Sequence, residues 1–356
     1  MIRILPVDET PASAIPYQDL GFGRYFADRM FTQRYARARG WYDAEIGPYA
    51  PITLDPAAQV LHNGQMIFDG TKAYRRPDGD LNLFRPDRNA ERFNRSAARM
   101  GMPDVPVEAH VEAIRELVRL EARWVPSAPQ TALYIRPVMI ATEKDLAIRA
   151  PGEFLHYIIL SPVAPYFAGG FAPIAVHVPH QYVRAVRGGT GEAKTPGNYA
   201  GSIAATEEAI AKGYQQVLWL DAVERRYVDE VGAMNIAFVY GGNRLLTPML
   251  SGAILHGITR ESILVLARDA GLEVSEARID FFEVLEDIRH GRITEVFGMG
   301  TGAVIAPVGR LGYQEQDIQV GDGQPGPVAR RLFDALMGIQ TGARPDPYCW
   351  THRIRL

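Results

Sequence analysis

The spacing of apolar and polar residues predicts alternating helices and strands in both halves of the chain. In the first half, apolar residues at helical intervals predict two amphipathic helices, over 89–100 and 107–120. Two further segments, 131–140 and 154–161, are rich in β-branched and aromatic residues and are predicted to be partly buried strands.

The second half continues the alternation with different spacing. The pattern predicts a helix over 198–212, strands over 217–220 and 233–240, a hairpin turn at 241–243, and helices from 259 to 270 and from 280 to 291. Asp280 followed by Glu283 is typical of a capping box, and Gly271 and Gly291 are typical of helix ends. Mixed helices and strands in both halves predict an α+β protein.

A change in composition predicts the boundary between two domains. Residues 161–173 contain three prolines and two glycines, which interrupt any regular pattern. We therefore expect a smaller N-terminal domain over 1–160, a linker over 161–173 and a larger C-terminal domain over 174–356. A cleft between two such domains is where a small ligand usually binds.

Composition and charge narrow the possible classes of function. Of the 356 residues 47% are hydrophobic, and a net charge of −3 without a basic run argues against a nucleic-acid partner. The longest apolar run is too short for a membrane span, so no membrane role is expected. The single cysteine, Cys349, forms no internal disulfide and fits a cytoplasmic location. The histidines show no metal-ligand spacing, and no metal site is expected.

The segment 188–202 contains a lone lysine, Lys194, among glycines, with Tyr199 five residues further on. Glycines allow close approach of a ligand, so this amine could react inside a pocket, although a solvated surface lysine would have the same local sequence. A phosphate-binding P-loop requires glycine before the lysine, and the chain has Ala193 there. A nucleoside triphosphatase is therefore disfavoured.

Three further segments could contribute to a cofactor site. Residues 298–303 formally match a dinucleotide fingerprint, but a predicted strand follows at 304–308, so what remains is a glycine-rich turn in which Thr301 could bind phosphate. The helix predicted to begin near Thr259 could bind phosphate at its N-terminus, or Thr259 could simply be an N-cap. Glu230 precedes a glycine and could pair with a protonated ring nitrogen, or be a solvated glutamate.

Together, a lysine, a tyrosine, a carboxylate and two phosphate-binding segments match the requirements of pyridoxal 5′-phosphate. Lysine binds this cofactor as a Schiff base, and a carboxylate keeps its ring nitrogen protonated.

The chain closely resembles the fold-type IV pyridoxal phosphate enzymes, which have a D-amino acid aminotransferase-like fold. Within them it is most similar to the larger branched-chain amino acid aminotransferases. The resemblance is carried by eleven separated segments, at 40–43, 61–65, 68–74, 83–87, 92–97, 134–137, 182–185, 216–221, 230–232, 257–260 and 297–301.

The resemblance implies a function and a set of cofactor contacts. The reaction would be ping-pong transamination between a branched-chain or related hydrophobic L-amino acid and 2-oxoglutarate, in a homodimer with the cofactor at the domain interface. Lys194 would form the Schiff base, Tyr199 would contact the phenolic oxygen and Glu230 the pyridine nitrogen. The phosphate would be held by Arg92, Ile258, Thr259 and Thr301.

The resemblance also implies a substrate site, and here the chain departs from the family pattern. The substrate-binding residues would be Phe68, Tyr134, Arg136, Ala233, Gly302 and Asn63. The family usually has tyrosine in place of Asn63, threonine in place of Ala233, alanine in place of Gly302, and glutamate in place of Asp69. These changes leave open a specialised aminotransferase that acts on a non-branched or modified amino acid. A lyase, a D-amino acid aminotransferase and a non-catalytic pyridoxal-binding protein are further alternatives.

Overall fold

The computed structural model describes residues 1–356, apart from the side chain of Ala12. The chain divides into two compact units. The first contains Met1–Tyr166, Ala193–Pro196 and Gly338–Leu356, and the second contains Phe167–Glu192 and Gly197–Met337. The main boundary falls inside the linker predicted at 161–173. Two segments that the sequence placed in the C-terminal domain, 193–196 and 338–356, belong to the first unit instead.

The first unit is built on one mixed sheet. Its strands are β1 Arg3–Ile4, β2 Arg29–Ala36, β3 Gly40–Pro48, β4 Met66–Phe68, β5 Thr71–Arg75, β6 Leu81–Phe84, β7 Ala132–Ala141, β8 Glu153–Val163 and β18 Thr351–Ile354. They are ordered β1-β3-β2-β8-β7-β5-β6-β18, and β4 also pairs with β7. The predicted strands at 131–140 and 154–161 are confirmed as β7 and β8.

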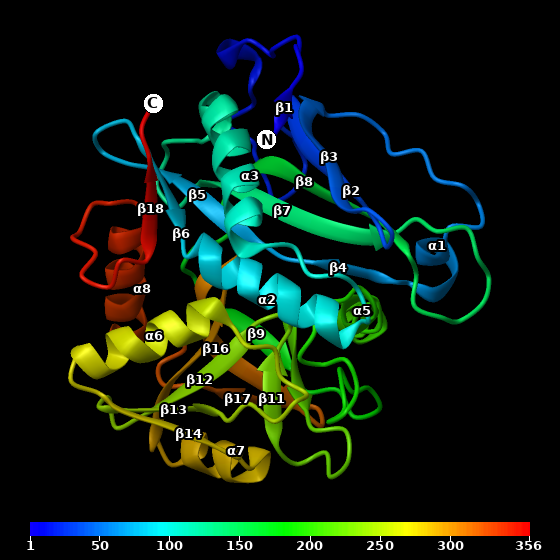
Figure 1. Ribbon diagram of the computed structural model, residues 1–356. Helices are drawn as coiled ribbons and strands as arrows, with labels where there is room; N and C mark the ends of the chain where they lie inside the picture. Colours follow the sequence, from blue (N-terminus) through cyan, green and yellow to red (C-terminus); the bar gives the residue numbers. More distant parts are fainter. The chain divides into compact units, whose positions relative to one another are not determined.

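Long-range pairing explains why the C-terminal segment lies in the first unit. Strand β18 pairs antiparallel with β6, with Thr351 opposite Phe84 and Ile354 opposite Leu81 (Figure 1). Ile354 is buried among the hydrophobic residues of the first unit. Without this pairing β6 would be an edge strand, and β18 gives it a hydrogen-bonded neighbour that lies far away in the sequence.

The helices of the first unit are η1 Ala12–Ala14, α1 Gln59–Asn63, α2 Pro86–Arg99, α3 Val107–Leu120 and η2 Ala122–Trp124. Helices α2 and α3 contribute buried side chains to the hydrophobic clusters of the sheet. Helix α3 has the predicted bounds (Figure 1). Its Ile114 and Leu117 belong to the same buried hydrophobic cluster as Leu133 and Ile135 of β7. Helix α2 begins at Pro86, before the predicted 89, because proline is suited to the first helical position.

The register of the sheet places a group of functional candidates on the opposite face. Phe68 pairs with Val138 and Lys72 pairs with Tyr134. Directly opposed residues share a face, and alternate residues of one strand share a face. Phe68, Lys72, Tyr134 and Arg136 therefore lie on the face opposite α3.

The second unit contains the other sheet. Its strands are β9 Ile174–His177, β10 Gln216–Leu220, β11 Val228–Val231, β12 Asn235–Tyr240, β13 Arg244–Pro248, β14 Glu273–Ala277, β15 Ile293–Gly300, β16 Val304–Tyr313 and β17 Gln316–Gln319. They are ordered β11-β10-β9-β16-β15-β12-β13-β14, and β17 pairs with β16. The predicted strand 233–240 begins later, at Asn235, because Val231 bridges to Met234 across a tight turn.

The helices of the second unit are α4 Gly197–Ala200, α5 Ile203–Ala211, α6 Ile258–Asp269 and α7 Phe281–Arg289, and α8 Pro327–Gln340 runs across the division. The helix predicted over 198–212 is thus two helices. The hairpin turn is confirmed between β12 and β13, where Gly241 and Gly242 have positive φ. Among the described residues, no helix is long and apolar enough to cross a membrane.

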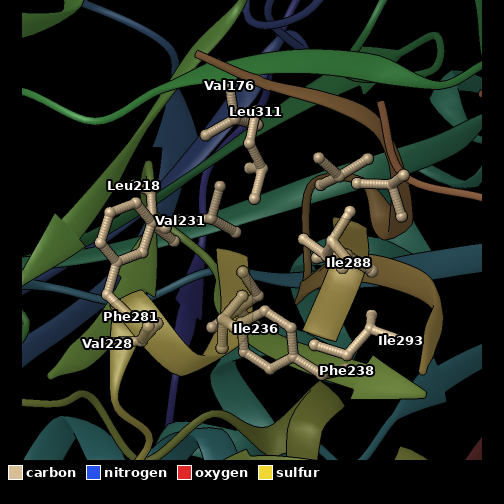
Figure 2. Close-up of a cluster of buried hydrophobic side chains, with 14 of the residues drawn as sticks. Val176, Leu218, Val228, Val231, Ile236, Phe238, Phe281, Ile288, Ile293 and Leu311 are labelled. Carbon is tan, nitrogen blue, oxygen red and sulfur yellow. The ribbon is translucent and has the colours of Figure 1, made fainter. Parts of the chain in front are cut away.

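Strands and α7 together form the core of the second unit. Phe238 of β12, Val231 of β11 and Leu311 of β16 are buried together with Phe281 and Ile288 of α7 (Figure 2). The N-terminus of α7 is fixed by Asp280, whose side chain accepts a hydrogen bond from the Phe282 N–H. This confirms Asp280 as a capping residue.

Candidate functional site

Hydrogen bonds attach the segment that contains Lys194 to α2 and β4 of the first unit. The Lys194 N–H donates to Ser96 Oγ of α2 at 2.9 Å, and the Phe68 N–H donates to the Lys194 carbonyl at 3.0 Å. Thr195 Oγ1 donates to the Met66 carbonyl at 2.8 Å. These bonds to α2 and β4 explain why Ala193–Pro196 belongs to the first unit.

The amine of Lys194 lies over an aromatic ring. Its Nζ is 5.0 Å from the centre of the Phe68 ring. Burial, helped by the charge of nearby Arg92, lowers the pKa of Lys194 from 10.5 to about 8. An appreciable fraction of the side chain is therefore a neutral amine near neutral pH, as a nucleophile or base requires.

Arg136 and Tyr134 complete this cluster. The Arg136 guanidinium lies 4.8 Å from the Phe68 ring centre, and its Nη2 donates to the Tyr134 hydroxyl at 3.1 Å. Gly70 passes so close that an added Cβ would come within 1.9 Å of that hydroxyl oxygen. The structure thus brings three predicted substrate-binding residues together around Lys194. We call Phe68, Asp69, Arg92, Ser96, Tyr134, Arg136 and Lys194 the Lys194 cluster.

Arg92, predicted to bind phosphate, is buried and paired with a carboxylate. Its Nε donates to Asp69 Oδ2 at 2.9 Å and its Nη2 to Asp69 Oδ1 at 2.7 Å. Asp69 was noted in the sequence only as a departure from the family pattern. Neither Asp69 nor Ser96 was predicted as a site residue, because neither pattern nor spacing shows which buried groups meet in the fold.

Asn63 lies elsewhere in the first unit. It is the last residue of α1, it is exposed, and it lines a surface hollow with Gln65, Met100 and Arg149. The described contacts around Lys194 do not include it.

In the second unit, Glu230 is the centre of another group of contacts. It is only 4% exposed, so it is not a solvated glutamate. Arg184 Nε lies 2.8 Å from its Oε2, while Asn235 Nδ2 and the Leu255 N–H each donate to its Oε1 at 3.1 Å. We call Arg184, Glu230, Asn235 and Leu255 the Glu230 cluster.

The sequence did not predict a role for Arg184, although a buried carboxylate on a strand requires a cation or several N–H donors. Arg184 also donates through Nη2 to the Ala253 carbonyl. It therefore ties the segment before Lys194 to the loop that precedes α6.

The N-terminus of α6 lies beside the Glu230 cluster. Gly257 is the N-cap, in place of the Thr259 considered from the sequence, and an added Cβ there would come within 1.8 Å of Asn235 Oδ1. Ile258 and Thr259 are buried in the first turn, and the N-cap Gly257 supplies no side-chain acceptor for the N–H groups of this turn. The N–H groups at the positive end of a helix suit an anion such as phosphate.

Two turns at one edge of the second sheet contain the remaining candidates. Asn235 of β12 is opposite Met299 of β15, so the turns before β12 and after β15 are neighbours. Ala233 is exposed in the first turn, and Thr301 and Gly302 are half-buried in the second. This edge also adjoins Asn235, which binds Glu230.

Tyr199 lies half-buried in the short helix α4. The loop before it is closed by Asn198, whose Nδ2 donates to the Thr190 carbonyl at 2.7 Å and whose Oδ1 accepts from Thr190 Oγ1 at 2.8 Å. The two bonds fix both ends of the segment that presents Lys194. The contact predicted for the Tyr199 hydroxyl stays a prediction.

Comparison with known families and sequences gives consistent results. Residues 66–311 match the model of the family described as amino-transferase class IV. The chain is 47% identical over 350 residues to a probable branched-chain-amino-acid aminotransferase of Streptomyces coelicolor, covering 98% of this chain and 96% of the relative. It is 49% identical to branched-chain-amino-acid transaminase 1 of Bacillus subtilis, with 94% of each chain covered.

Solved structures of similar fold include branched-chain amino acid aminotransferases. The branched-chain amino acid aminotransferase of Escherichia coli superposes with a TM-score of 0.74 at 26% identity, covering 90% of this chain and 98% of that one. The T.th. branched-chain amino acid aminotransferase with pyridoxamine 5′-phosphate superposes with a TM-score of 0.73 at 27% identity, covering 90% of this chain and 97% of that one.

Proposed function

This chain belongs to the class IV aminotransferases, and we propose that it transfers the amino group of a branched-chain or related hydrophobic L-amino acid to 2-oxoglutarate. The family and the α+β fold predicted from the motifs are confirmed by the comparisons. The products would be a 2-oxo acid and L-glutamate, and the cofactor would be pyridoxal 5′-phosphate.

The observation that carries the proposal is the environment of Lys194. A half-buried amine with a pKa of about 8 lies over the Phe68 ring, beside the guanidinium of Arg136. A lysine in this state can hold an aldehyde cofactor covalently and can exchange protons near neutral pH.

The donor groups on this chain fit pyridoxal 5′-phosphate. Lys194 would hold it covalently, Tyr199 would contact its phenolic oxygen, and the buried Glu230 carboxylate would pair with its ring nitrogen. Its phosphate would be held by Arg92, Thr301 and the N–H groups of Ile258 and Thr259 at the start of α6. When bound, this cofactor supplies an electron sink that stabilises negative charge at the substrate α-carbon.

The side chains around Lys194 fit both substrates. The Phe68 and Tyr134 rings present an apolar surface to a branched side chain. Arg136, whose guanidinium lies 4.8 Å from the Phe68 ring centre, would present a planar fork of N–H groups to the side-chain carboxylate of 2-oxoglutarate. Lys194 Nζ takes up the proton that the substrate α-carbon loses.

A specialised aminotransferase of the same family would act on a non-branched or modified amino acid. Asn63, Ala233 and Gly302 are the residues that motivate it, because they replace larger or hydroxyl-bearing side chains of the family pattern. Identities of 47% and 49% over nearly the full length favour the branched-chain substrate. The substitutions Asn63→Tyr and Ala233→Thr test this alternative. If both leave the rate ratio of leucine to methionine unchanged, these positions do not set specificity.

The proposal includes a homodimer and a cytoplasmic location. The homodimer follows from the family resemblance, and the lone Cys349 fits a reducing compartment.

Formation of L-glutamate from L-leucine and 2-oxoglutarate tests the proposed function. Sedimentation of the same sample gives its oligomeric state. The purified chain supplied with pyridoxal 5′-phosphate should form glutamate with each branched-chain amino acid. Absence of glutamate with leucine, isoleucine and valine, together with its formation from another amino acid, would instead establish the specialised enzyme.

A further inference from the structure

Asp69 is a fully buried carboxylate at the centre of the Lys194 cluster. It follows Phe68 at the end of β4, and its exposed fraction is 0%. Its two oxygens accept hydrogen bonds from the Arg92 guanidinium and, at 2.7 Å, from the Gly70 N–H. Its own N–H donates to the Pro137 carbonyl at 2.9 Å. Both the backbone and the side chain of Asp69 are therefore fixed.

The Asp69–Arg92 pair is bidentate, which fixes both the position and the plane of the guanidinium. A buried ion pair of this kind contributes little net stability compared with a well-packed apolar pair. Stability alone therefore does not explain a charged pair at this position. The residues around the pair suggest a functional reason.

Each member of the pair is connected to Lys194 through one intervening residue. Asp69 adjoins Phe68, whose N–H binds the Lys194 carbonyl and whose ring lies under the Lys194 amine. Arg92 is one helical turn before Ser96, which accepts from the Lys194 N–H and donates from Oγ to the Arg92 carbonyl at 3.1 Å. The pair thus joins β4 to α2 at the two points where Lys194 is held.

The charges of the pair also act on Lys194 with opposite signs. Arg92 lowers the pKa of Lys194, and Asp69 raises it. Asp69 therefore offsets part of the lowering that Arg92 causes in the pKa of Lys194.

We propose that Asp69 is a positioning residue, which holds the Arg92 guanidinium in one orientation beside Lys194 so that Arg92 can bind the phosphate of the cofactor. The assignment of the phosphate rests on the proposed function, whereas the contacts with Arg92 and the Lys194 segment do not.

The test compares two variants that each neutralise a buried carboxylate paired with arginine in the first unit. Asp69→Asn changes the proposed residue. Glu121→Gln is the matched control, because Glu121 is also fully buried and pairs with Arg29 at 2.6 Å. Asp69→Glu keeps the charge and serves as the conservative variant.

Three quantities are measured on the full chain of each variant. They are the midpoint of thermal unfolding, the affinity for pyridoxal 5′-phosphate, and the pH dependence of Lys194 acetylation by acetic anhydride in the cofactor-free chain, followed by mass spectrometry. The acetylation midpoint reports the pKa of Lys194 without any cofactor.

We expect Asp69→Asn to weaken pyridoxal 5′-phosphate binding by about tenfold or more, since hydrogen bonds to charged groups have effects of this size. Its acetylation midpoint falls, because removal of a negative charge disfavours the protonated amine. Asp69→Glu restores most of the affinity. Glu121→Gln lowers the unfolding midpoint but changes neither the affinity nor the acetylation midpoint.

If Asp69→Asn behaves like Glu121→Gln, with a change in stability alone, Asp69 is a structural residue and the proposal is wrong. If the unchanged chain takes up no pyridoxal 5′-phosphate, the proposed function fails instead. In that case an acetylation midpoint equal in Asp69→Asn and the unchanged chain still overturns the positioning role.

Discussion

The Lys194 cluster and the Glu230 cluster each contain a buried carboxylate paired with an arginine, but a different member of the pair is proposed to bind the cofactor. In the Lys194 cluster, a buried aspartate pairs with Arg92, and the arginine is the member proposed to bind the cofactor. In the Glu230 cluster, a buried glutamate pairs with Arg184, and the glutamate is the member proposed to do so. Asp69 stabilises the positive charge of Arg92 for the cofactor phosphate, and Arg184 stabilises the negative charge of Glu230 for the ring nitrogen.

The geometry of the two pairs differs accordingly. Both oxygens of Asp69 are taken by Arg92, which fixes the cation. Arg184 approaches Glu230 through Nε, and it donates through Nη2 to the Ala253 carbonyl, while Asn235 and Leu255 hold the other glutamate oxygen. The residue type therefore does not show which member of a pair positions the other. The further hydrogen bonds that each member makes do show it.

The largest expected effect comes from removing the amine itself. Lys194→Ala should reduce glutamate formation by on the order of a thousandfold or more, since loss of a covalent nucleophile and base removes a whole step. Lys144→Ala is the control, because Lys144 is an exposed partner of Asp55. Steady-state kinetics check both, and near-normal activity of Lys194→Ala would remove this residue from the reaction.

Breaking the second pair should mainly affect stability. Arg184→Met leaves the Glu230 carboxylate buried without its cation, at an expected cost of about 3–5 kcal/mol in the free energy of unfolding. The double variant with Glu230→Gln should recover much of this loss but none of the activity. Denaturant unfolding measures the coupling, and additive effects of the two substitutions would contradict a direct ion pair.

Two buried groups, one in each unit, should contribute to the pH dependence of stability with opposite signs. In the first unit, burial lowers the pKa of His110 from 6.5 to about 4, with Asp69 the nearby charge and His156 the ring stacked on it. Between these pH values the unfolded state binds the extra proton, so stability is lost as pH falls. His110→Phe should remove this loss, which is on the order of 3 kcal/mol.

In the second unit, burial raises the pKa of Asp229 from 3.8 to about 7, near Arg184, Glu230 and Asp221. Here the folded state binds the extra proton, so the contribution to stability is present at acid pH and lost as pH rises through about 7. Asp229→Asn should remove this trend. The unfolding midpoints of each variant and of the unchanged chain are compared from pH 4 to 8. If the two substitutions changed the pH dependence of the midpoint in the same direction, the opposite signs assigned to His110 and Asp229 would be wrong.

The smallest expected effect is at Ser96. Ser96→Ala removes the acceptor of the Lys194 N–H and should cost about 1 kcal/mol of stability and lower kcat several-fold with little change in KM. Thr247→Val in the second unit is the matched control, since it removes a buried hydroxyl that donates to the Ile236 carbonyl at 2.7 Å. Equal kcat in the two variants would show that Ser96 has no special role.

Much of the fold could be predicted from local pattern. The apolar face of α3, the hairpin glycines 241 and 242, and the Asp280 cap each follow from short-range rules, and each is present. The placement of 338–356 was missed, because the pairing of β18 with β6 depends on a contact between distant segments.

The site shows the same limit. Lys194 and Glu230 stand out in the sequence by residue type and glycine context, and the structure gives each a buried or partly buried, charged environment. Asp69, Ser96 and Arg184 do not stand out, because their roles depend on partners that only the folded chain brings near.

The most direct test of the account is a single half-reaction. The chain carrying pyridoxal 5′-phosphate is mixed with L-leucine without any acceptor, and absorbance and released 2-oxo acid are followed. The account predicts conversion of the bound cofactor to pyridoxamine 5′-phosphate with about one equivalent of 2-oxo acid for each Lys194, as a ping-pong transamination requires. Bound cofactor that stays unchanged with leucine, isoleucine and valine would contradict it.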